Sequence, residues 1–520
     1  MLLVKNVNLP IETDFDNCKN EVAAALKINP KNIKSLSLYR KSVDARHKNN
    51  IVFCCSFLIE TVGNVKLKNA EPYQYKPYKW QKCESNLRPL IVGFSPAGMF
   101  AALVLARAGL RPIVVERGAE VNERAKKVEA FFKGEKLDLE SNIQFGEGGA
   151  GTFSDGKLNT GIKDVRCRTV LEQFVSFGAP KNILTDAKPH IGTDVLRNVV
   201  KSLRNEIEKL GGEIHFNTKL ENIITENGKI KGAECSGKIG KIETSHIVLA
   251  IGHSARDTFS VLRKNDVALS RKPFSVGARI EHLQKDINSA LYGSFANRKE
   301  LGAADYKMAV HLENGRGVYT FCMCPGGEVV NASSEADGIA VNGMSNSLRN
   351  GENANSALLV EIKEDDLMGD DVFAGIALQR EIEQNAFKAA NGNVPYCFVG
   401  DLYGEFQGGG SIKPTVKPKA VHTDIKEVLP DFVSESIKTA LPLFEKKISG
   451  FSDYNAVLTF PETRSTSPVR IDRNELYQSV NLAGLFPAGE GAGYAGGIMS
   501  AAVDGMRVAE AVIFDINNTK

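Results

Sequence analysis

The stretch Leu90-Ile-Val-Gly-Phe-Ser-Pro-Ala-Gly98, with Ile113-Val-Val-Glu116 after it, decides the fold of this chain. It reads as a short apolar strand, an alanine-rich apolar helix and a second strand. Gly93 permits a tight turn, Gly98 lets the helix pack closely on the sheet, and the helix N-terminus offers free N–H groups to a pyrophosphate. Glu116 follows Gly93 by 23 residues, where an acidic side chain accepts hydrogen bonds from ribose hydroxyls. The stretch therefore predicts a βαβ unit that binds a dinucleotide.

One glycine of this pattern is replaced. Ser95 takes the middle position, where the backbone comes closest to the phosphates, and its hydroxyl would donate to a phosphate. The alternative is an ordinary βαβ turn that is rich in glycine, but strand, helix, strand and acidic residue all stand at the right spacing. An acidic residue at position 116 favours a ribose with a free 2′-hydroxyl, as in FAD or NAD, over NADP.

The composition indicates a globular protein with several domains. The chain has 520 residues, of which 42% are hydrophobic and 24% charged, which is enough for about two to four domains with sizeable cores. Its nine cysteines show no metal-ligand spacing and no signal peptide is visible, so we expect a cytoplasmic protein without a metal site. The most apolar long stretch, residues 483–503, contains Glu490 and many glycines, so we expect no membrane span.

The order of the expected elements divides the chain into four segments. The expected fold class is α/β: a Rossmann-like FAD/NAD(P)-binding domain with a parallel sheet and helices, an α+β cap domain with an antiparallel sheet, and a small α+β N-terminal module. The segments are the basic module and linker (1–85), the first part of the FAD-binding domain (86–268), the cap or substrate domain (269–453), and the second part of the FAD-binding domain (454–520).

The N-terminal part is basic. Residues 1–88 carry 15 Lys and Arg against 8 Asp and Glu, a net charge of +7, so the rest of the chain carries −4 of the total of +3. We expect residues 1–9 to form an edge strand of this module. The linker Pro72-Tyr-Gln-Tyr-Lys-Pro-Tyr-Lys-Trp-Gln81 interleaves lysines with aromatic rings, a composition that would bind nucleic acid by stacking and charge. We favour the other interpretation, in which the rings pack the linker against the main body.

Three further motifs accompany the βαβ unit. Between Phe145 and Lys157 the chain has five glycines, which bring backbone amides close to a flat or anionic ligand. A buried strand over residues 244–250 ends in an Ala-x-Gly sequence, where this class of fold returns beside its first strand. Near the C-terminus, a strand ending in Gly-Glu precedes a glycine-rich helix start and a helix over residues 500–514.

Together these motifs are similar to the FAD domain of the glutathione-reductase class. The segments 145–157, 321–327, 351–356 and 462–470 more closely resemble a bacterial family of uncharacterised FAD-dependent dehydrogenases. This resemblance covers nearly the whole chain and implies FAD as the cofactor, without implying a substrate.

The resemblance assigns cofactor-binding roles to residues along the chain. The fingerprint residues would cradle the pyrophosphate, the acidic residue and its neighbour would hold the ribose, the glycine-rich loop would lie along the ribityl chain or isoalloxazine, and the last helix would point its N-terminus at the flavin pyrimidine. A lysine would bond flavin N5. The residues are Gly93, Ser95, Pro96, Ala97, Gly98, Glu116, Arg117, Gly148, Gly149, Gly151, Thr152, Lys157, Gly252, Gly489, Glu490, Gly496, Gly497 and Ile498.

The candidate catalytic groups are Cys322, Cys324 and His253. The two cysteines are one residue apart, so on a strand they face the same side and would form a redox pair that accepts electrons from FAD. The alternative, which we favour, is two buried core cysteines, because a disulfide across one residue is strained. His253 would lie near the flavin or its phosphates, or it would have only a structural, positioning role. Arg464 and Arg470 would anchor an anionic substrate or form ion pairs at a domain junction.

The sequence therefore predicts an FAD-dependent oxidoreductase that transfers hydride between flavin N5 and a small-molecule substrate lying against the cap. No second fingerprint exists, so NAD(P)H would bind only transiently, or another reductant would serve. An alternative is a flavoprotein acting on RNA or a protein partner that residues 1–80 recruit. A redox sensor without turnover also stays open.

Overall fold

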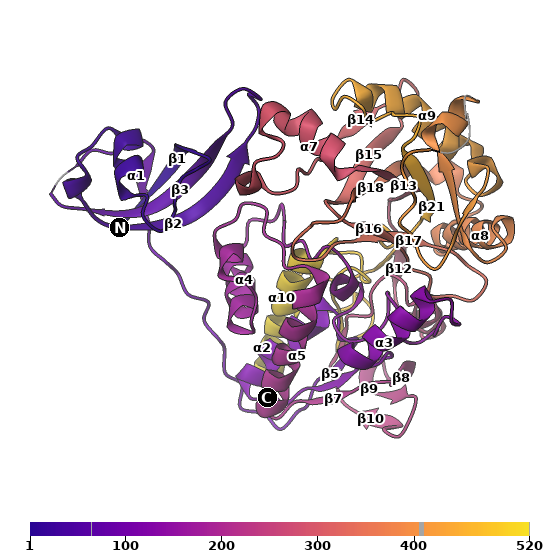
Figure 1. Cartoon of the computed structure of the whole chain (residues 1–520). Helices are drawn as coiled ribbons and strands as arrows, with labels where there is room; N and C mark the ends of the chain where they lie inside the picture. Colours follow the sequence, from indigo (N-terminus) through magenta and orange to yellow (C-terminus); the bar gives the residue numbers. More distant parts are fainter. Residues whose placement is uncertain (64, 405–409, 519–520) are drawn as a thin grey trace.

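The computed structural model describes residues 1–63, 65–404 and 410–518. Figure 1 shows a small N-terminal module projecting from a larger body, in which the cap domain lies above the nucleotide-binding domain. In the described part of the chain, no helix combines the length and apolar character needed to cross a membrane.

A five-stranded parallel sheet forms the centre of the nucleotide-binding domain. Its middle strand is the apolar strand of the fingerprint, and the strand that ends in Ala-x-Gly pairs with it, as the sequence predicts. One outer strand comes from near the end of the chain. The order is β23 (Leu485–Pro487), β11 (Ile247–Leu249), β5 (Leu90–Val92), β6 (Ile113–Val115) and β7 (Glu213–His215).

Both faces of this sheet are covered, each by different elements. Because neither face is exposed, its short strands are apolar throughout. Ile91 and Val114 point toward a layer of helices, whereas Leu90 and Val92 point toward a small antiparallel sheet and one helix. The first layer comprises α2 (Pro96–Ala108), α4 (Arg166–Ser176), α5 (Thr193–Lys209) and α10 (Ile498–Asn518). The second comprises β8 (Leu220–Glu226), β9 (Lys229–Cys235), β10 (Lys241–Glu243) and α6 (Arg256–Lys264).

Helix α2 lies so close to its neighbours that two positions exclude any side chain. A β-carbon on Gly98 would come within 2.0 Å of the Gly93 carbonyl oxygen. One on Gly505 of α10 would come within 2.1 Å of the Ala97 carbonyl oxygen. The role that the sequence gives to Gly98, close helix packing, is therefore the role it has in the fold.

We expect Gly98→Ala to destabilise the protein by about 3 kcal/mol, because the clash is with backbone that a rotamer change cannot relieve. Thermal unfolding and the FAD content of the purified variant measure the effect. Gly161→Ala is the matched control, since a β-carbon there would meet no atom within 4 Å. Equal melting temperatures for the two variants would contradict the packing argument.

The cap domain is built on a seven-stranded sheet with helices α7 (Gln284–Tyr292), α8 (Ala374–Ala389) and α9 (Asp431–Glu445) around it. All neighbouring strands are antiparallel except the last pair. The order is β14 (Ala309–His311), β15 (Gly317–Cys324), β18 (Asn353–Ile362), β13 (Phe274–Leu283), β21 (Val457–Glu462), β19 (Val394–Phe398) and β20 (Ala420–His422). A short ribbon, β16 (Glu328–Asn331) with β17 (Val341–Met344), lies beside it.

Strand β21 changes the boundary expected for the cap. It lies beyond residue 453, where the sequence analysis ends this domain, yet it pairs with β13 in the middle of the cap sheet. The chain returns to the nucleotide-binding domain only afterwards, through β22 (Val469–Ile471), which pairs with β12 (Leu269–Arg271). We therefore place the end of the cap after Glu462.

The N-terminal module is a four-stranded sheet in the order β2-β3-β1-β4 with one helix, α1 (Lys19–Leu26). Its strands are β1 (Leu2–Pro10), β2 (Ile33–Asp44), β3 (Val52–Thr61) and β4 (Ala70–Pro72). The expectation that the first strand lies at the edge is wrong, because β4 pairs with its outer side. The sequence Ala-Glu-Pro of β4 has no apolar alternation that would reveal a strand.

The module and its linker are fixed to the body. The amide of Lys41 donates to the Thr185 carbonyl (2.7 Å), and the amide of Ala187 donates to the Lys41 carbonyl (2.8 Å). In the linker, the Tyr78 hydroxyl donates to Glu510 on α10 (2.6 Å), and the Arg107 guanidinium lies 4.1 Å from the centre of the Trp80 ring. These rings pack against the main body, which is the interpretation favoured above.

Candidate functional site

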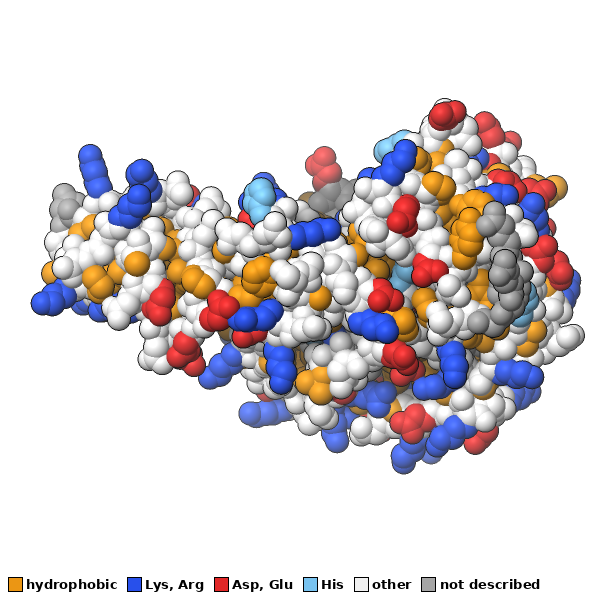
Figure 2. Space-filling model, turned by 45° about the horizontal axis from the view of Figure 1, so that its top comes forward, with side chains coloured by type: hydrophobic (Ala, Val, Ile, Leu, Met, Phe, Trp, Pro, Cys, Tyr) orange, Lys and Arg blue, Asp and Glu red, His pale blue; other side chains and the backbone are white. Residues whose placement is uncertain are grey.

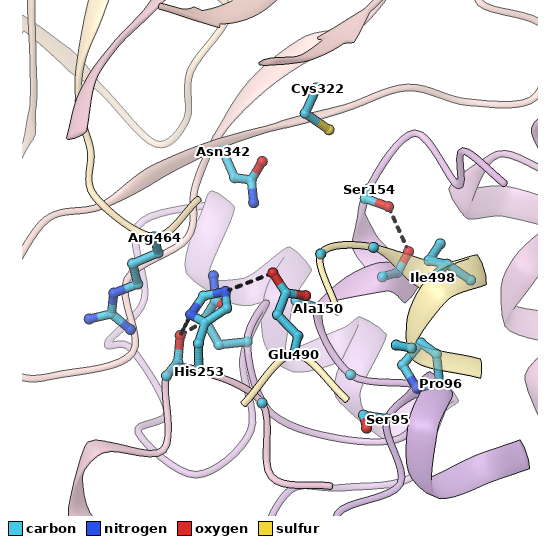
Figure 3. Close-up of a pocket in the computed structure, with 18 of the residues that line it drawn as sticks. Ser95, Pro96, Ala150, Ser154, His253, Cys322, Asn342, Arg464, Glu490 and Ile498 are labelled. Carbon is cyan, nitrogen blue, oxygen red and sulfur yellow. Dashed lines mark hydrogen bonds and ion pairs between the residues drawn. The ribbon is translucent and has the colours of Figure 1, made fainter. Parts of the chain in front are cut away.

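A cavity of about 450 Å³ lies between the nucleotide-binding domain and the cap. Its floor is formed by the turn after β5, the glycine-rich loop, the turn after β11 and the start of α10, and its roof by β15, β17 and the residues after β21. Figure 3 shows Ser95, Pro96, Glu490 and Ile498 on the floor and Cys322 on the opposite side.

Most of the residues singled out in the sequence line this cavity, and some lie just behind it. Those in the wall are Gly93, Ser95, Pro96, Glu116, Arg117, Gly149, Gly151, Lys157, Gly252, His253, Cys322, Arg464, Glu490, Gly496, Gly497 and Ile498. Those that the structure places outside the wall are Ala97, Gly98, Gly148, Thr152, Cys324, Arg470 and Gly489.

The residues behind the wall have structural partners instead. The Thr152 hydroxyl donates to the Glu147 carbonyl (3.3 Å) and the amide of Gly489 donates to Asp504 (2.7 Å). A β-carbon on Gly148 would lie 2.0 Å from the Thr152 hydroxyl oxygen. These residues shape the backbone that carries the wall.

Glu116 is held in place by backbone amides. One carboxylate oxygen accepts from Phe94 (2.8 Å), and the other accepts from Gly118 (3.0 Å) and Gly146 (2.9 Å). Three donors fix the carboxylate at the cavity wall, where its remaining lone pairs can accept ribose hydroxyls. The neighbouring Arg117 faces two acids, Glu140 and Asp257, so its charge is already paired.

The turn after β5 presents glycine backbone to the cavity, but its Ser95 does not make the contact that the sequence predicts. The Ser95 hydroxyl donates to the Ala250 carbonyl (2.8 Å), so its proton is not directed at a phosphate. Gly252, Gly496 and Gly497 all line the cavity, and a β-carbon on any of them would meet no protein atom within 4 Å. This open space beside glycine backbone fits the close approach of a large planar cofactor.

A residue that the sequence analysis missed holds the glycine-rich loop. Arg124 on α3 (Val121–Phe132) is fully buried, and its guanidinium donates to four carbonyls, two in the loop and two in the residues just before it. They belong to Asn142 (2.8 Å), Ile143 (2.8 Å), Glu147 (2.7 Å) and Gly149 (3.0 Å). The sequence does contain a sign of this role, because Arg124 lies on the apolar helix face that includes Val121 and Val128.

Glu490 and His253 meet at the floor of the cavity. Nε2 of His253 lies 3.9 Å from a carboxylate oxygen of Glu490, as Figure 3 shows. Burial raises the pKa of Glu490 to about 7. Burial, with Arg464 and Arg256 nearby, lowers the pKa of His253 to about 3. His253 is therefore neutral at physiological pH, and Glu490 is the group that gains or loses a proton there.

We expect Glu490 to make FAD affinity depend on pH around 7. Above its pKa the carboxylate is anionic and repels the anionic cofactor, and below it the neutral acid does not, so the dissociation constant should rise by up to about tenfold per pH unit. Flavin fluorescence titrations between about pH 6 and 8 measure it, and Glu490→Gln should remove the dependence. The exposed Glu123→Gln is the control. A variant at position 490 with the wild-type profile would refute the assignment.

The cap side of the cavity holds one of the two candidate cysteines. Cys322 lines the cavity, whereas Cys324 is fully buried behind it. Arg279, fully buried on β13, donates to the Cys322 carbonyl (2.7 Å) and pairs with Glu462 (2.8 Å). Sequence patterns did not single out Arg279, because β13 alternates apolar and polar residues like a strand with one exposed face, whereas in the fold it is buried along nearly its whole length.

Arg464 lines the cavity but its charge is paired. It contacts Glu383 through two nitrogens (2.8 and 2.9 Å), and Arg256 contacts the same carboxylate through two more (2.8 and 2.9 Å). Arg464 is thus an ion-paired residue at the domain junction. Arg470 lies outside the wall, with its guanidinium 5.4 Å from the centre of the Tyr494 ring.

Family models match the cap and the N-terminal module of this chain. A family model described as "FAD-dependent protein, C-terminal domain-like" matches residues 273–465, and a domain of unknown function, DUF8436, matches residues 1–60. An uncharacterized protein of Clostridium beijerinckii is 44% identical over 99% of this chain and 99% of its own. Protein FixC of Escherichia coli K12 is 27% identical over 41% of this chain and 47% of its own.

Among solved structures, a geranylgeranyl bacteriochlorophyll reductase-like protein of Thermoplasma acidophilum aligns with a TM-score of 0.35. It is 13% identical, over 83% of this chain and 79% of that one.

The βαβ unit, the fixed carboxylate and the glycine cradle define a Rossmann-like flavoprotein. The chain belongs to the family of FAD-dependent proteins that the Clostridium beijerinckii protein represents, and FAD is its cofactor. The resemblance, the fold class and the cofactor expected from the sequence are confirmed.

Proposed function

We propose that this flavoenzyme is an oxidoreductase that transfers hydride between FAD and a small-molecule substrate held against the cap. One observation carries the proposal: the same cavity has residues expected to bind FAD as its floor and cap residues as its roof. A substrate against the roof would face the cofactor directly, which is the arrangement that hydride transfer requires.

FAD supplies the hydride chemistry when it is bound, and the protein supplies position and charge. Glu116 would hold the ribose, and the bare glycine backbone would admit the rest of the cofactor. Glu490, with its pKa near 7, would hold or release a proton at its carboxylate, beside Nε2 of neutral His253. Lys157 would face the flavin from the glycine-rich loop.

An ion pair at the edge of the cavity joins the two domains. Lys188 and Asp305 both line the cavity and form an ion pair across the boundary (2.6 Å). This contact supports a substrate position between the domains, because it brings a residue of each domain together at the cavity wall.

The test is the visible spectrum of the purified protein, after loading with FAD if needed, during anaerobic titration with NADH and then NADPH. A protein that takes up no FAD would overturn the proposal. Bleaching within seconds would identify a nicotinamide as the electron donor. A flavin that stays oxidised would move the search to other small-molecule reductants.

The alternative, a flavoprotein that acts on RNA or a protein recruited by residues 1–80, has less support. Figure 2 shows basic side chains of the projecting module interspersed with acidic and hydrophobic ones on this face, and the linker rings are used in packing. Retention of RNA by the full-length protein at low salt, lost at high salt, would revive it.

A further inference from the structure

Strand β15 ends in a bulge that holds a strained cysteine. Phe321 pairs with Ala357 and Cys324 pairs with Asn355, so two residues of β15 stand opposite one residue of β18. Cys322, the first of the two, has a φ of 44°, a left-handed conformation that is uncommon for a residue with a β-carbon. Backbone strain of this kind concentrates at functional sites, where the surroundings hold it in place.

The bulge gives the two cysteines different surroundings. Cys322 lines the cavity, and Figure 3 shows it across the open space from Glu490 and Ala150. Cys324 is fully buried, with its sulfur 3.3 Å from the Cys322 carbonyl oxygen. One sulfur can therefore meet a ligand while the other is shielded from it.

Two buried cations lie beside this pair. Nη2 of Arg279 lies 3.8 Å from the Cys324 sulfur. Among the described residues, Nζ of Lys157 is buried without a hydrogen-bond partner, and the acid beside it, Asp155 at 3.5 Å, is already bound by Arg349. A positive charge with no bonded partner is what a thiolate would complement.

The two thiols consequently differ in acidity. A hydrogen bond from Cys324, with the charges of Lys157 and Arg279, lowers the pKa of Cys322. The same hydrogen bond and burial raise the pKa of Cys324. A thiolate facing the ligand and a protonated thiol behind it differ from two inert core cysteines, whose surroundings would be apolar and uncharged.

We propose that Cys322 and Cys324 are a dithiol–disulfide centre that exchanges an electron pair with FAD. This inference rests on the proposed oxidoreductase function and adds a second redox group to the same cavity. On reduction the S–S bond breaks, the Cys322 sulfur leaves as a thiolate and the Cys324 sulfur takes a proton. The reduced cofactor supplies both electrons and that proton and becomes oxidised, so no further reactant is needed. The charges of Lys157 and Arg279 stabilise the Cys322 thiolate.

The test is an anaerobic titration of the air-oxidised holoenzyme with dithionite, read from the flavin spectrum. The wild-type protein should take up about four electrons per FAD, two for the flavin and two for the disulfide, and Cys324→Ser about two. Cys322→Ser should behave like Cys324→Ser and provides the answer if that variant does not fold. Cys167→Ser, a half-buried cysteine of α4 outside the cavity, should keep about four.

A second measurement reads the bond itself. Alkylation of the denatured protein before and after reduction, followed by mass spectrometry, should find the peptide that contains both cysteines protected only in the oxidised enzyme. A wild-type protein that takes up about two electrons, with both cysteines alkylated in the oxidised form, would overturn the inference and leave the proposed function standing. A protein that holds no FAD would overturn both.

Discussion

Replacement of Arg124 by methionine is expected to weaken FAD binding by about 100-fold or more. The side chain donates to four carbonyls in the glycine-rich loop and the residues just before it, and methionine fills similar volume without donating to any of them. Each buried carbonyl left without a donor costs about 1–3 kcal/mol, so the loop should abandon the conformation that lines the cavity. A loss of about 3 kcal/mol in binding corresponds to more than a hundredfold change in the dissociation constant.

Fluorescence titration of the apoprotein with FAD measures the effect. Lys126→Met is the matched control, because it removes the same charge from an exposed position on the same helix and should bind FAD like the wild-type protein. If Arg124→Met binds FAD with unchanged affinity, the loop is held by something other than these four hydrogen bonds.

Replacement of Glu383 by glutamine is expected to lower the free energy of unfolding by about 3–5 kcal/mol. The Glu383 carboxylate lies between the guanidinium groups of Arg256 and Arg464, and all three side chains are buried. A neutral amide would leave two buried cations with Glu335, which contacts Arg256 at 2.5 Å and Arg464 at 3.8 Å, as their remaining anion. Loss of one partner from a buried ion cluster is among the most costly changes in a protein interior. The cluster joins α6 to the cap, so we expect the junction to open first.

Urea unfolding, followed by the fluorescence of Trp80 and by circular dichroism, measures this loss. Glu381→Gln, an exposed carboxylate on the same helix, should unfold at the wild-type midpoint. The two arginines lower the pKa of Glu383. The stability that its ion pairs contribute is therefore present at neutral pH and is lost only in strong acid, as the pH falls through the folded-state pKa. Equal midpoints for the two variants at neutral pH would show that the cluster contributes little.

The nucleotide-binding fold could be predicted because its signals are local. The tight turn at Gly93, the apolar helix and the acid at position 116 each follow from a few consecutive residues. The same holds for the glycines that line the cavity, since bare backbone is visible in the sequence itself. The edge strand β4 could not be predicted, because three residues are too few to show a periodicity. Strand β21 lies on the other side of the predicted boundary between the cap and the nucleotide-binding domain, because its partner β13 lies about 180 residues earlier.

The charged groups around the site could be predicted only in part. Arg124 was recognisable as a cation on an apolar helix face, although its four partners were not. Arg279 and Glu383 depend on contacts between segments far apart in the chain, and no spacing rule reports such contacts. The sequence predicts that the Ser95 hydroxyl donates to a phosphate and could not reveal its hydrogen bond to Ala250, because this bond joins two turns that are neighbours only in the folded sheet.

The parallel sheet takes its outer strand β23 from a part of the chain made long after the other four, and α10 follows it. During synthesis the N-terminal module and most of the cap emerge from the ribosome first and can fold as units. The carboxylate of Glu490 and the glycines at the start of α10 arrive last. Any cofactor contact that these groups make can therefore form only after β23 and the start of α10 have been synthesised.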